Sequence, residues 1–325
     1  MIKTLRHILL AAGAALMLSS CLVHEFPEGI EEVDVAINLD FQDVITPYKT
    51  VSKALLKAAD ENCRVRYTLK AYEYAGDAFD KRARFTTVIF KEDASSPANT
   101  LHFVLPSGKY KILCWADYVY DEERTVFWEP ADLGKVTLPE DYYGASDRRD
   151  AFRGELDIDI TDFHATGMSS LHVMPMHRPL GKYVLVATDK QEFLTKNLTK
   201  AGYDFSTFTA VVDYQQFFPS AYSCFYDRAT GSSTGISYDC TLVEKDNGEV
   251  EMAFDYVLLS EQESDIVLNI TLFDAQGEDL GTVRNVKVPM KRNGLTTVRG
   301  SFLTKGTVSG ISIDPGFAGD HNVNI

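Results

Sequence analysis

Hydrophobic residues recur at every second position along much of the chain, which is the spacing of strands with one buried face. The clearest case is residues 33–41, where Val33, Val35, Ile37, Leu39 and Phe41 alternate with polar or small residues. Similar strand-like stretches follow at residues 65–71, 86–90, 101–105, 110–118, 156–160, 183–187, 208–214, 236–243, 249–258, 266–273, 280–288 and 296–302. So many short strands predict a mainly β protein built from antiparallel sandwiches.

Short glycine-containing links between these strands are typical of hairpin turns, at residues 106–108, 246–248 and 275–277.

Two stretches have helical spacing instead. Residues 50–61 carry apolar residues at helical intervals, at Val51, Leu55, Leu56 and Ala59. Residues 189–202 begin with Asp189, followed by Glu192, and end at Gly202, which are helix start and stop signals. We expect both stretches to be short surface helices.

The length of the chain predicts the number of domains. At roughly 150 residues per domain, 325 residues suffice for two. Residues 142–167 are rich in Asp, Arg and Gly, and we place the boundary at Gly167. We therefore expect an N-terminal sandwich over residues 33–167 and a C-terminal sandwich over residues 168–325.

The N-terminus has the composition of an export signal. Lys3 and Arg6 precede an apolar run over residues 8–18, which is too short to span a bilayer, and two serines follow before Cys21. This ending resembles the lipobox of bacterial lipoproteins, in which a peptidase cuts before a cysteine that has received a diacylglycerol. The alternative is an ordinary secretory signal that contains a cysteine. The sequence thus predicts a signal peptide over residues 1–20 and lipidation of Cys21.

A lipid at Cys21 would hold the protein on a membrane without a spanning helix. Residues 21–32 contain Pro27, Gly29 and four glutamates, and predict a short acidic tether. We expect the protein at the outer membrane, lipid-anchored and displayed on the cell surface.

Composition limits the function classes. Hydrophobic residues make up 45% and charged residues 24% of the chain, as in ordinary globular proteins. The formal net charge of -15 argues against a nucleic-acid partner, because phosphate binding relies on clustered Lys and Arg.

Signals for catalysis or metal binding are weak. Residues 231–235 match G-x-S-x-G, but a strand is predicted where a nucleophile elbow needs a helix. Asp157 and Asp159 alternate with apolar residues, so they face solvent from a strand. Together with Asp162 they lack the central Gly and closing Glu of a calcium loop. The sequence therefore predicts a protein that is not an enzyme, with no metal site and no cofactor.

Four cysteines follow Cys21: Cys63, Cys114, Cys224 and Cys240. An exported protein can form disulfides, and pairing Cys63 with Cys114 and Cys224 with Cys240 would keep each bridge in one half of the chain. The alternative is free thiols, because Cys114 lies in an apolar strand-like run where a cysteine packs as a small hydrophobe.

Five stretches of the chain resemble segments of fimbrillin-like lipoproteins of Bacteroides-type bacteria. Residues 105–117 resemble a strand pair with a tight turn in the first domain of that family. Residues 147–154 and 177–182 resemble segments before and at the start of the second domain, and residues 288–300 and 311–317 resemble the final strands. Their order behind a lipobox makes the chain similar to this family over most of its mature length.

The resemblance implies two tandem transthyretin-like β-sandwiches and a role as a structural, anchor or accessory subunit of a surface fimbria, or pilus, with a part in adhesion. In this family a stalk subunit loses its first strand to a surface protease, and the groove left behind accepts a strand from the next subunit. The incoming strand satisfies exposed backbone groups by β-augmentation. By this analogy residues 33–41 are the exchangeable strand. The implied partners are other fimbrial subunits, the membrane through the lipid, and a host or bacterial surface ligand.

Basic residues near this strand differ from the family's processing pattern. Processing of its stalk subunits follows an arginine, but residues 21–63 contain none. Candidate processing residues are Lys49, Lys53 and Lys57 in the linker and Arg64 and Arg66 at the next strand. Either a different protease acts, or the first strand stays in place, as expected for an anchor or accessory subunit.

A surface glycan-binding lipoprotein is the alternative function. Sandwich domains on lipid anchors also hold sugars on exposed aromatic platforms, for which Trp115, Trp128, Tyr142 and Tyr143 are the candidate rings. Of these we expect Trp128 and the two tyrosines to be exposed. A coplanar exposed patch of such rings would favour this alternative.

Overall fold

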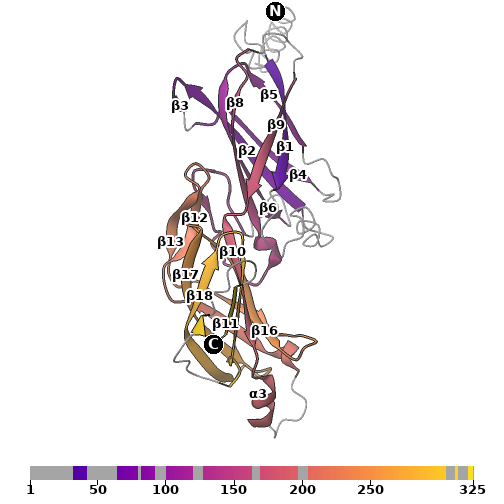
Figure 1. Ribbon diagram of the computed structural model, residues 1–325, viewed down its shortest axis with the longest axis vertical. Coiled ribbons are helices and arrows are strands. Elements are labelled where there is room, and N and C mark those ends of the chain that lie inside the picture. Colours follow the sequence, from indigo (N-terminus) through magenta and orange to yellow (C-terminus); the bar gives the residue numbers. More distant parts are fainter. Residues whose placement is uncertain are drawn as a thin grey trace, which may run out of the picture.

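The protein forms two β-rich bodies stacked along one long axis (Figure 1). The computed structural model describes residues 32–41, 64–79, 82–91, 100–119, 127–162, 169–196, 204–304, 312–313 and 321–324. Several predicted features lie outside the described residues: the signal peptide, the tether up to residue 31, Cys21, Lys49, Lys53, Lys57, Cys63, Gly167 and the helix at residues 50–61.

The first body contains eight strands: β1 (Glu32–Phe41), β2 (Arg64–Ala75), β3 (Ala78–Phe79), β4 (Phe85–Lys91), β5 (Thr100–Pro106), β6 (Lys109–Val119), β8 (Ala151–Asp159) and β9 (Ser169–His177). Their order is β3-β2-β6-β8-β9-β1-β5, and β4 also pairs with β2. β8 and β9 share only two residue pairs. The sheet folds over at this connection, and Phe85 of β4 stacks on Phe103 of β5 with ring centroids 5.0 Å apart. The first body is therefore a sandwich of a β4-β2-β6-β8 layer and a β9-β1-β5 layer.

Gly154 allows these two layers to approach each other. A Cβ atom at this position would lie 2.4 Å from Sδ of Met176 and 2.6 Å from Sδ of Met174, both on β9. A strand glycine of this kind marks a place where another chain segment comes very close. Any side chain at residue 154 would displace these methionine side chains.

The second body contains the strands from β10 onward: β10 (Leu180–Ala187), β11 (Thr209–Tyr214), β12 (Phe218–Ser223), β13 (Arg228–Ser233), β14 (Ser237–Thr241), β15 (Val243–Glu244), β16 (Val250–Leu258), β17 (Glu263–Phe273), β18 (Asp279–Lys291), β19 (Leu295–Gly300), β20 (Ser312–Ile313) and β21 (His321–Asn324). A sheet of order β15-β16-β10-β19-β21-β20 shares a core with a sheet of order β14-β11-β17-β18. A small β13-β12-β7 sheet includes β7 (Val136–Thr137) from the connection between the bodies. The short helical elements are η1 (Asp147–Arg149), α3 (Lys190–Lys196) and η2 (Phe205–Thr207).

Three hydrophobic cores hold the molecule together, one inside each body and one between them. β6 contributes to two of these cores. Ile112, Cys114 and Ala116 point into the first body, whereas Leu113 and Trp115 point into the core between the bodies. This is why nearly every residue of β6 is buried, although a strand with one solvated face would alternate.

The prediction of a mainly β protein with sandwich architecture is confirmed, and every predicted strand matches an observed one. The strands β3, β7, β9, β12, β13, β20 and β21 are additional to the predicted ones. β12 and β13 mix Ser, Pro and Gly with few alternating apolar residues. Not all pairing is antiparallel. β1 is parallel to β9, and β19 is parallel to both β10 and β21.

The expected boundary at residue 167 does not coincide with the change of body. β9 follows that position, yet it pairs with β1 and β8 of the first body. The chain passes to the second body between His177 and Leu180. Sequence composition marked a polar stretch near the boundary, but strand pairing extends the first body by one strand.

The predicted turns have two different structures. Residues 246–248 and 275–277 close hairpins between paired strands, with Gly248 and Gly277 at φ +81° and +78°. Residues 106–108 instead connect β5 to β6, which lie in opposite layers and do not pair. The hairpin prediction is therefore wrong there. Ser107 Oγ holds this link by donating to the backbone oxygen of Ile160 at 3.1 Å.

The predicted helix at residues 189–202 is described only over α3. The carboxylate of Asp189 does not cap this helix. It accepts from the backbone N–H of Leu303 at 3.2 Å and of Thr304 at 2.8 Å, and so attaches the end of β10 to the turn after β19. The backbone N–H groups of this turn thus bind the carboxylate in place of the N–H groups at the start of the helix.

Candidate assembly site and domain junction

β1 is the central strand of the β9-β1-β5 layer (Figure 1). It is antiparallel to β5 over seven residue pairs and parallel to β9 over eight. Val33, Val35 and Ile37 are fully buried, and Leu39 is 3% exposed. Phe41 packs edge-on against Phe152 with ring centroids 5.2 Å apart. The alternation predicted for residues 33–41 therefore corresponds to a core-facing strand.

The neighbours of β1 depend on it for pairing. β5 pairs with no other strand among the described residues, and β9 otherwise shares only two residue pairs with β8. Removal of β1 would leave unpaired backbone N–H and C=O groups along both neighbours and an apolar groove between them. An incoming strand with the same alternation could fill both.

Of the candidate processing residues, Arg64 and Arg66 are described and both lie in β2. Arg64 is half-buried at the start of the strand, opposite Val119 of β6. Arg66 is 7% exposed, and its guanidinium donates to both carboxylate oxygens of Asp117 at 2.9 and 2.5 Å. A protease would need β2 to separate from β6 before it could cut at either position. Cleavage there remains an expectation from the sequence.

The core between the bodies is aromatic. Trp115 of β6 and Trp128 of the connecting segment pack edge-on with ring centroids 5.7 Å apart, and Tyr222 of β12 lies 6.1 Å from Trp115. Nε1 of Trp128 donates to the backbone oxygen of Arg149 at 3.0 Å. We call the residues that join the bodies, from Phe127 to Asp150 with their contacts on β6, β12 and β16, the domain junction.

A buried polar cluster connects this junction to the second body. Arg149 Nε lies 3.0 Å from the carboxylate of Asp255 on β16, and the two side chains are 1% and 0% exposed. Hydroxyls of Tyr142 and Tyr214 donate to the same carboxylate at 2.5 and 2.8 Å. Burial raises the pKa of Asp255, and the charge of Arg149 opposes this rise. Burial also holds the pKa of both tyrosines well above the ordinary value, so their hydroxyls stay protonated.

Further arginines cross the junction. Arg178 donates to both carboxylate oxygens of Asp150 at 2.6 and 2.7 Å and to the side-chain oxygen of Asn293 at 2.7 Å. Arg153 of β8 donates to the backbone oxygen of Cys224 at 2.7 Å. Within the second body, Arg292 donates to the carboxylate of Asp227 at 2.9 Å, and this carboxylate lies 3.6 Å from Nε of Arg153 on the first body. Such bidentate and multiple bonds are directional, so they hold the bodies in one relative orientation.

Sequence analysis did not assign these arginines a role, although a signal was present. Residues 147–154, 177–182 and 288–300, singled out for their resemblance to a family, contain Arg149, Asp150, Arg153, Arg178, Arg292 and Asn293. The structure brings the three segments together at the junction. The signal was thus the resemblance of these three segments to a family, since their local sequence is polar and does not itself indicate burial.

The expected aromatic platform does not form. Trp115 is 0% and Trp128 1% exposed, and Tyr142 packs against the second core while its hydroxyl bonds Asp255. Tyr143 alone of the four rings is exposed, at 42%. The expectation that Trp128 and Tyr142 face solvent is wrong, because Trp128 is buried at the junction and Tyr142 packs, partly buried, against the core of the second body.

Three of the cysteines are free thiols: Cys114, Cys224 and Cys240. The proposed bridge between Cys224 and Cys240 is therefore absent, and Cys114 forms no bridge. Burial raises the pKa of the Cys224 thiol to about 12 and that of Cys240 to about 11. Both thiols are protonated at neutral pH and weakly reactive.

Acidic side chains of the described residues do not gather into a metal-binding cluster. Asp157 and Asp159 lie on the exposed side of β8, as predicted, and Asp159 pairs with Lys109 at 2.8 Å.

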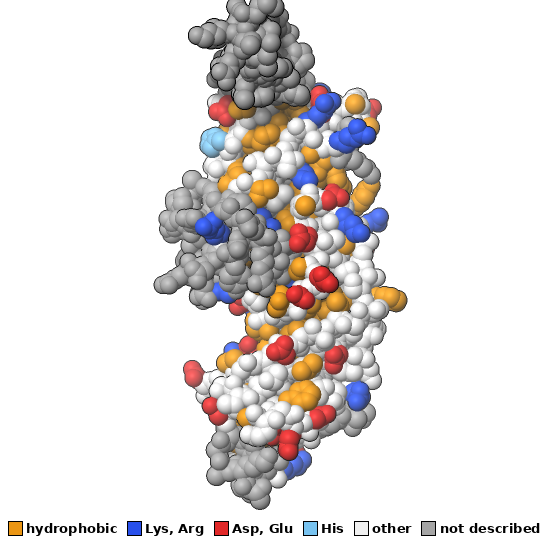
Figure 2. Space-filling model, turned by 180° about the vertical axis from the view of Figure 1, so that it is seen from behind, with side chains coloured by type: hydrophobic (Ala, Val, Ile, Leu, Met, Phe, Trp, Pro, Cys, Tyr) orange, Lys and Arg blue, Asp and Glu red, His pale blue; other side chains and the backbone are white. Residues whose placement is uncertain are grey.

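Residues 231–235 begin in β13 and lead toward β14, so a strand and not a helix follows the serines. Acidic side chains are spread across the second body on the face seen in Figure 2.

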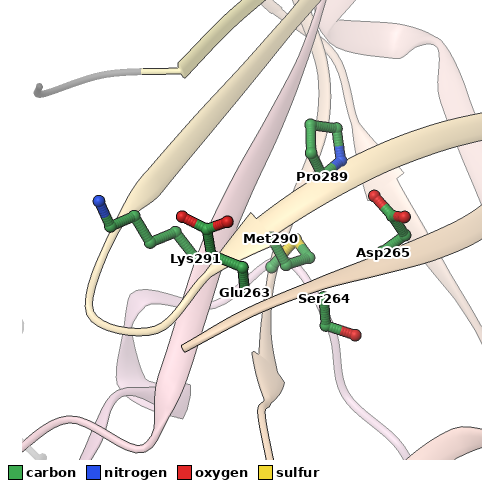
Figure 3. A pocket seen from close by; sticks show the side chains of 6 residues that line it. All are labelled: Glu263, Ser264, Asp265, Pro289, Met290 and Lys291. Atoms are coloured by element: carbon green, nitrogen blue, oxygen red, sulfur yellow. The ribbon is translucent and has the colours of Figure 1, made fainter. Parts of the chain in front are cut away.

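One shallow pocket of about 270 Å³ lies at the start of β17 and the end of β18. Figure 3 shows Glu263, Ser264 and Asp265 on one strand and Pro289, Met290 and Lys291 on the other, with the Lys291 ammonium extended away from the strand pair. Asp265 pairs with Lys287 at 2.8 Å. The side chains do not converge on a common point, so this pocket is a weak candidate for a ligand site.

The fold is that of a protein with two β-sandwich bodies that are connected through buried arginines. The chain belongs to a family described as a family of unknown function, DUF6562, which matches residues 27–325. No curated protein matches the sequence. Among the described residues, no helix is long and apolar enough to cross a membrane.

Several solved structures resemble the protein at low identity. A candidate polysaccharide-binding protein (DUF1812) from Bacteroides thetaiotaomicron has a TM-score of 0.44 and 9% identity, covering 78% of this chain and 80% of its own. The fimbrial anchor protein Mfa2 from Porphyromonas gingivalis has a TM-score of 0.40 and 11% identity, with 77% and 81% covered. A fimbrial assembly protein from Parabacteroides distasonis has a TM-score of 0.39 and 8% identity, with 83% and 90% covered. At these values the function has to be argued from the chain's own residues.

Proposed function

We propose that the protein is a lipid-anchored structural, anchor or accessory subunit of a cell-surface fimbria, with a part in adhesion. It is held in the outer membrane by lipid on Cys21, and it joins other fimbrial subunits through exchange of the strand β1. Its two bodies act as two sandwich domains that divide at Arg178. The lipobox and the family resemblance of the sequence support anchoring and the fimbrial setting.

The observation that carries this proposal is the position of β1. Residues 42–63 are its only covalent connection to the rest of the first body, and both of its backbone edges are paired. Its four buried aliphatic side chains each contribute about 1.5–3 kcal/mol, so the strand contributes about 6–12 kcal/mol by burial. This is comparable to the whole stability of a domain, about 5–15 kcal/mol. A first body without β1 therefore needs a replacement strand.

Retention of β1 would favour an anchor or accessory role. A subunit that keeps its own strand offers no groove to a neighbour, and it keeps the covalent path from Cys21 to the fold. A subunit that loses β1 also loses the lipid, because Cys21 precedes the strand. The maturation state therefore distinguishes a stalk role from an anchor role.

Strand exchange can be tested on the purified protein with a specific protease site placed within residues 42–63. After cleavage, β1 is held only by pairing and packing, and a fluorescent peptide of residues 31–42 should replace it. A peptide carrying Val35→Asp and Ile37→Asp is the matched control, because it places charges in the apolar groove. Uptake of neither peptide, or equal uptake of both, would contradict the proposal.

Anchoring and maturation can be tested in cells. We expect incorporation of labelled palmitate, and its loss in Cys21→Ser. Terminal sequencing of the protein recovered from surface fibres then reports the role: an N-terminus at residue 21 indicates an anchor or accessory subunit, and one beyond Phe41 indicates a stalk subunit. An unlabelled protein absent from fibres would refute the proposed function.

A further inference from the structure

A cleft of about 390 Å³ lies on the first body, away from the β9-β1-β5 layer. Arg66, Thr68 and Lys70 line it from the face of β2 opposite the core. On β4, Thr86 and Val88 stand next to Lys70 and Thr68 in the register. Residues 129–131 of the domain junction line the remaining side. The volume is at the lower end of the range for small-molecule sites.

Thr68 is the sign that a partner is missing. It is 2% exposed, and its hydroxyl oxygen is buried without a hydrogen-bond partner among the described residues. A buried hydroxyl of this kind lowers the stability of the fold, whereas a valine of the same shape would not. A ligand that bonds the hydroxyl from within the cleft would supply the missing partner.

The cleft also contains a cation, Lys70, without an ion pair among the described residues, and the Glu129 carboxylate is the acidic group of its lining. Arg66 is neutralised by Asp117, and its Nε and Nη2 are occupied, which leaves Nη1 without a bond among the described residues. Lys70 donates one hydrogen bond, to the backbone oxygen of Ala131, and forms no ion pair within the described parts of the chain. Two N–H groups of its ammonium therefore remain available to a ligand anion.

The other lining groups indicate the rest of the ligand. The Thr86 hydroxyl can donate and accept, and the Glu129 carboxylate at the exposed rim can accept from hydroxyl groups. Val88 and Pro130 offer small apolar surfaces. None of the described lining residues is aromatic, so these residues offer no stacking partner to a planar base or ring. Hydroxyl-binding groups around one cation match a polyhydroxylated ring that carries a carboxylate.

We propose that this cleft binds an acidic saccharide, with its carboxylate on Lys70 and Arg66 and its hydroxyl groups on Thr68, Thr86 and Glu129. The site uses polar side chains of the β4-β2-β6-β8 layer and the junction. It does not depend on an aromatic platform or on strand exchange, so its test is independent of the fimbrial role.

Calorimetric titration of the purified mature protein tests the proposal, with digalacturonate as the acidic probe and galactobiose as its neutral counterpart. We expect binding of the acidic probe and at least about tenfold weaker binding of the neutral one, because the charge-assisted bonds are lost. Inorganic sulfate is a third probe. Sulfate that binds as tightly as digalacturonate would reduce the site to an anion site and overturn the proposal, as would absence of binding by the acidic probe.

Variants then place the binding in the cleft. Lys70→Met should weaken binding at least about tenfold, and Lys70→Arg should restore most of it. Thr68→Val should weaken binding about threefold to tenfold and, at the same time, raise the melting temperature. Lys287→Met and Thr241→Val, which change exposed side chains of the second body, are the controls. Affinity unchanged in Lys70→Met and Thr68→Val would overturn the proposal.

Discussion

Replacement of Arg149 by methionine tests the argument that the junction holds the two bodies together. The guanidinium and the Asp255 carboxylate are 3.0 Å apart and almost fully buried. Breaking a buried pair by removing one partner costs about 3–5 kcal/mol, because the other charge is left in an apolar surrounding. Asp255 keeps hydrogen bonds from Tyr142, Tyr214 and the backbone N–H of Tyr256. We therefore expect the free energy of unfolding to fall by about 3 kcal/mol.

Urea denaturation at pH 7 measures this loss as a lower midpoint. The control is Lys287→Met, which breaks the pair with Asp265, where both side chains are 46% exposed. Exposed pairs contribute about 0–1 kcal/mol. A loss in Arg149→Met no larger than in the control would refute the reasoning.

The pH dependence of the same variant provides a second readout. Without Arg149, burial raises the pKa of Asp255 further above that of the unfolded chain. The folded state then binds a proton more tightly than the unfolded state. Its stability relative to the wild type therefore recovers as the pH falls from 7 towards the unfolded value of about 3.9. A defect of constant size between pH 7 and pH 4 would contradict the assignment to a buried carboxylate.

Three further predictions follow from single positions. Gly154→Val should destabilise the protein by about 1–3 kcal/mol, because the new side chain collides with the methionine sulfurs of β9, and a melting temperature equal to the wild type would contradict this. Cys114 and Cys224 should stay unmodified by a thiol reagent in the native protein and react only after unfolding, since both are buried and free. Rapid native labelling of Cys224 would show that the junction opens, and rapid labelling of Cys114 would show that the core of the first body opens. Burial acts to raise the pKa of Asp227, but the Tyr222 hydroxyl and two arginines outweigh it and lower the value. The stability from Asp227 should therefore be present above about pH 4 and disappear as the pH falls below it; an acid-unfolding midpoint unchanged in Asp227→Asn would contradict this.

The junction determines how far the two bodies can move relative to each other. Buried ion pairs and an aromatic core both cross it, so the two bodies should move as one unit. Contacts between the domains of one chain commonly permit relative motion unless the interface is large and hydrophobic. A rigid connection would keep β1, for which we propose strand exchange, and the cleft in a constant orientation relative to the second body.

Local spacing along the chain was sufficient to predict the β class, most strands and the burial of β1. A strand with one buried face needs only an alternation of apolar and polar residues, and that alternation is a property of neighbouring positions. Two of the three glycine-containing turns were predicted for the same reason, since Gly248 and Gly277 satisfy a local backbone requirement.

Pairing partners and buried charges required the folded chain. The 106–108 link resembles a hairpin in sequence, yet β5 and β6 lie in different layers, because β1 takes the place next to β5. Trp128 and Arg149 resemble surface residues by their polar neighbours, yet both are buried where segments distant in sequence meet. Contacts between such segments depend on how the layers stack, and no pattern within a short stretch of sequence contains that information.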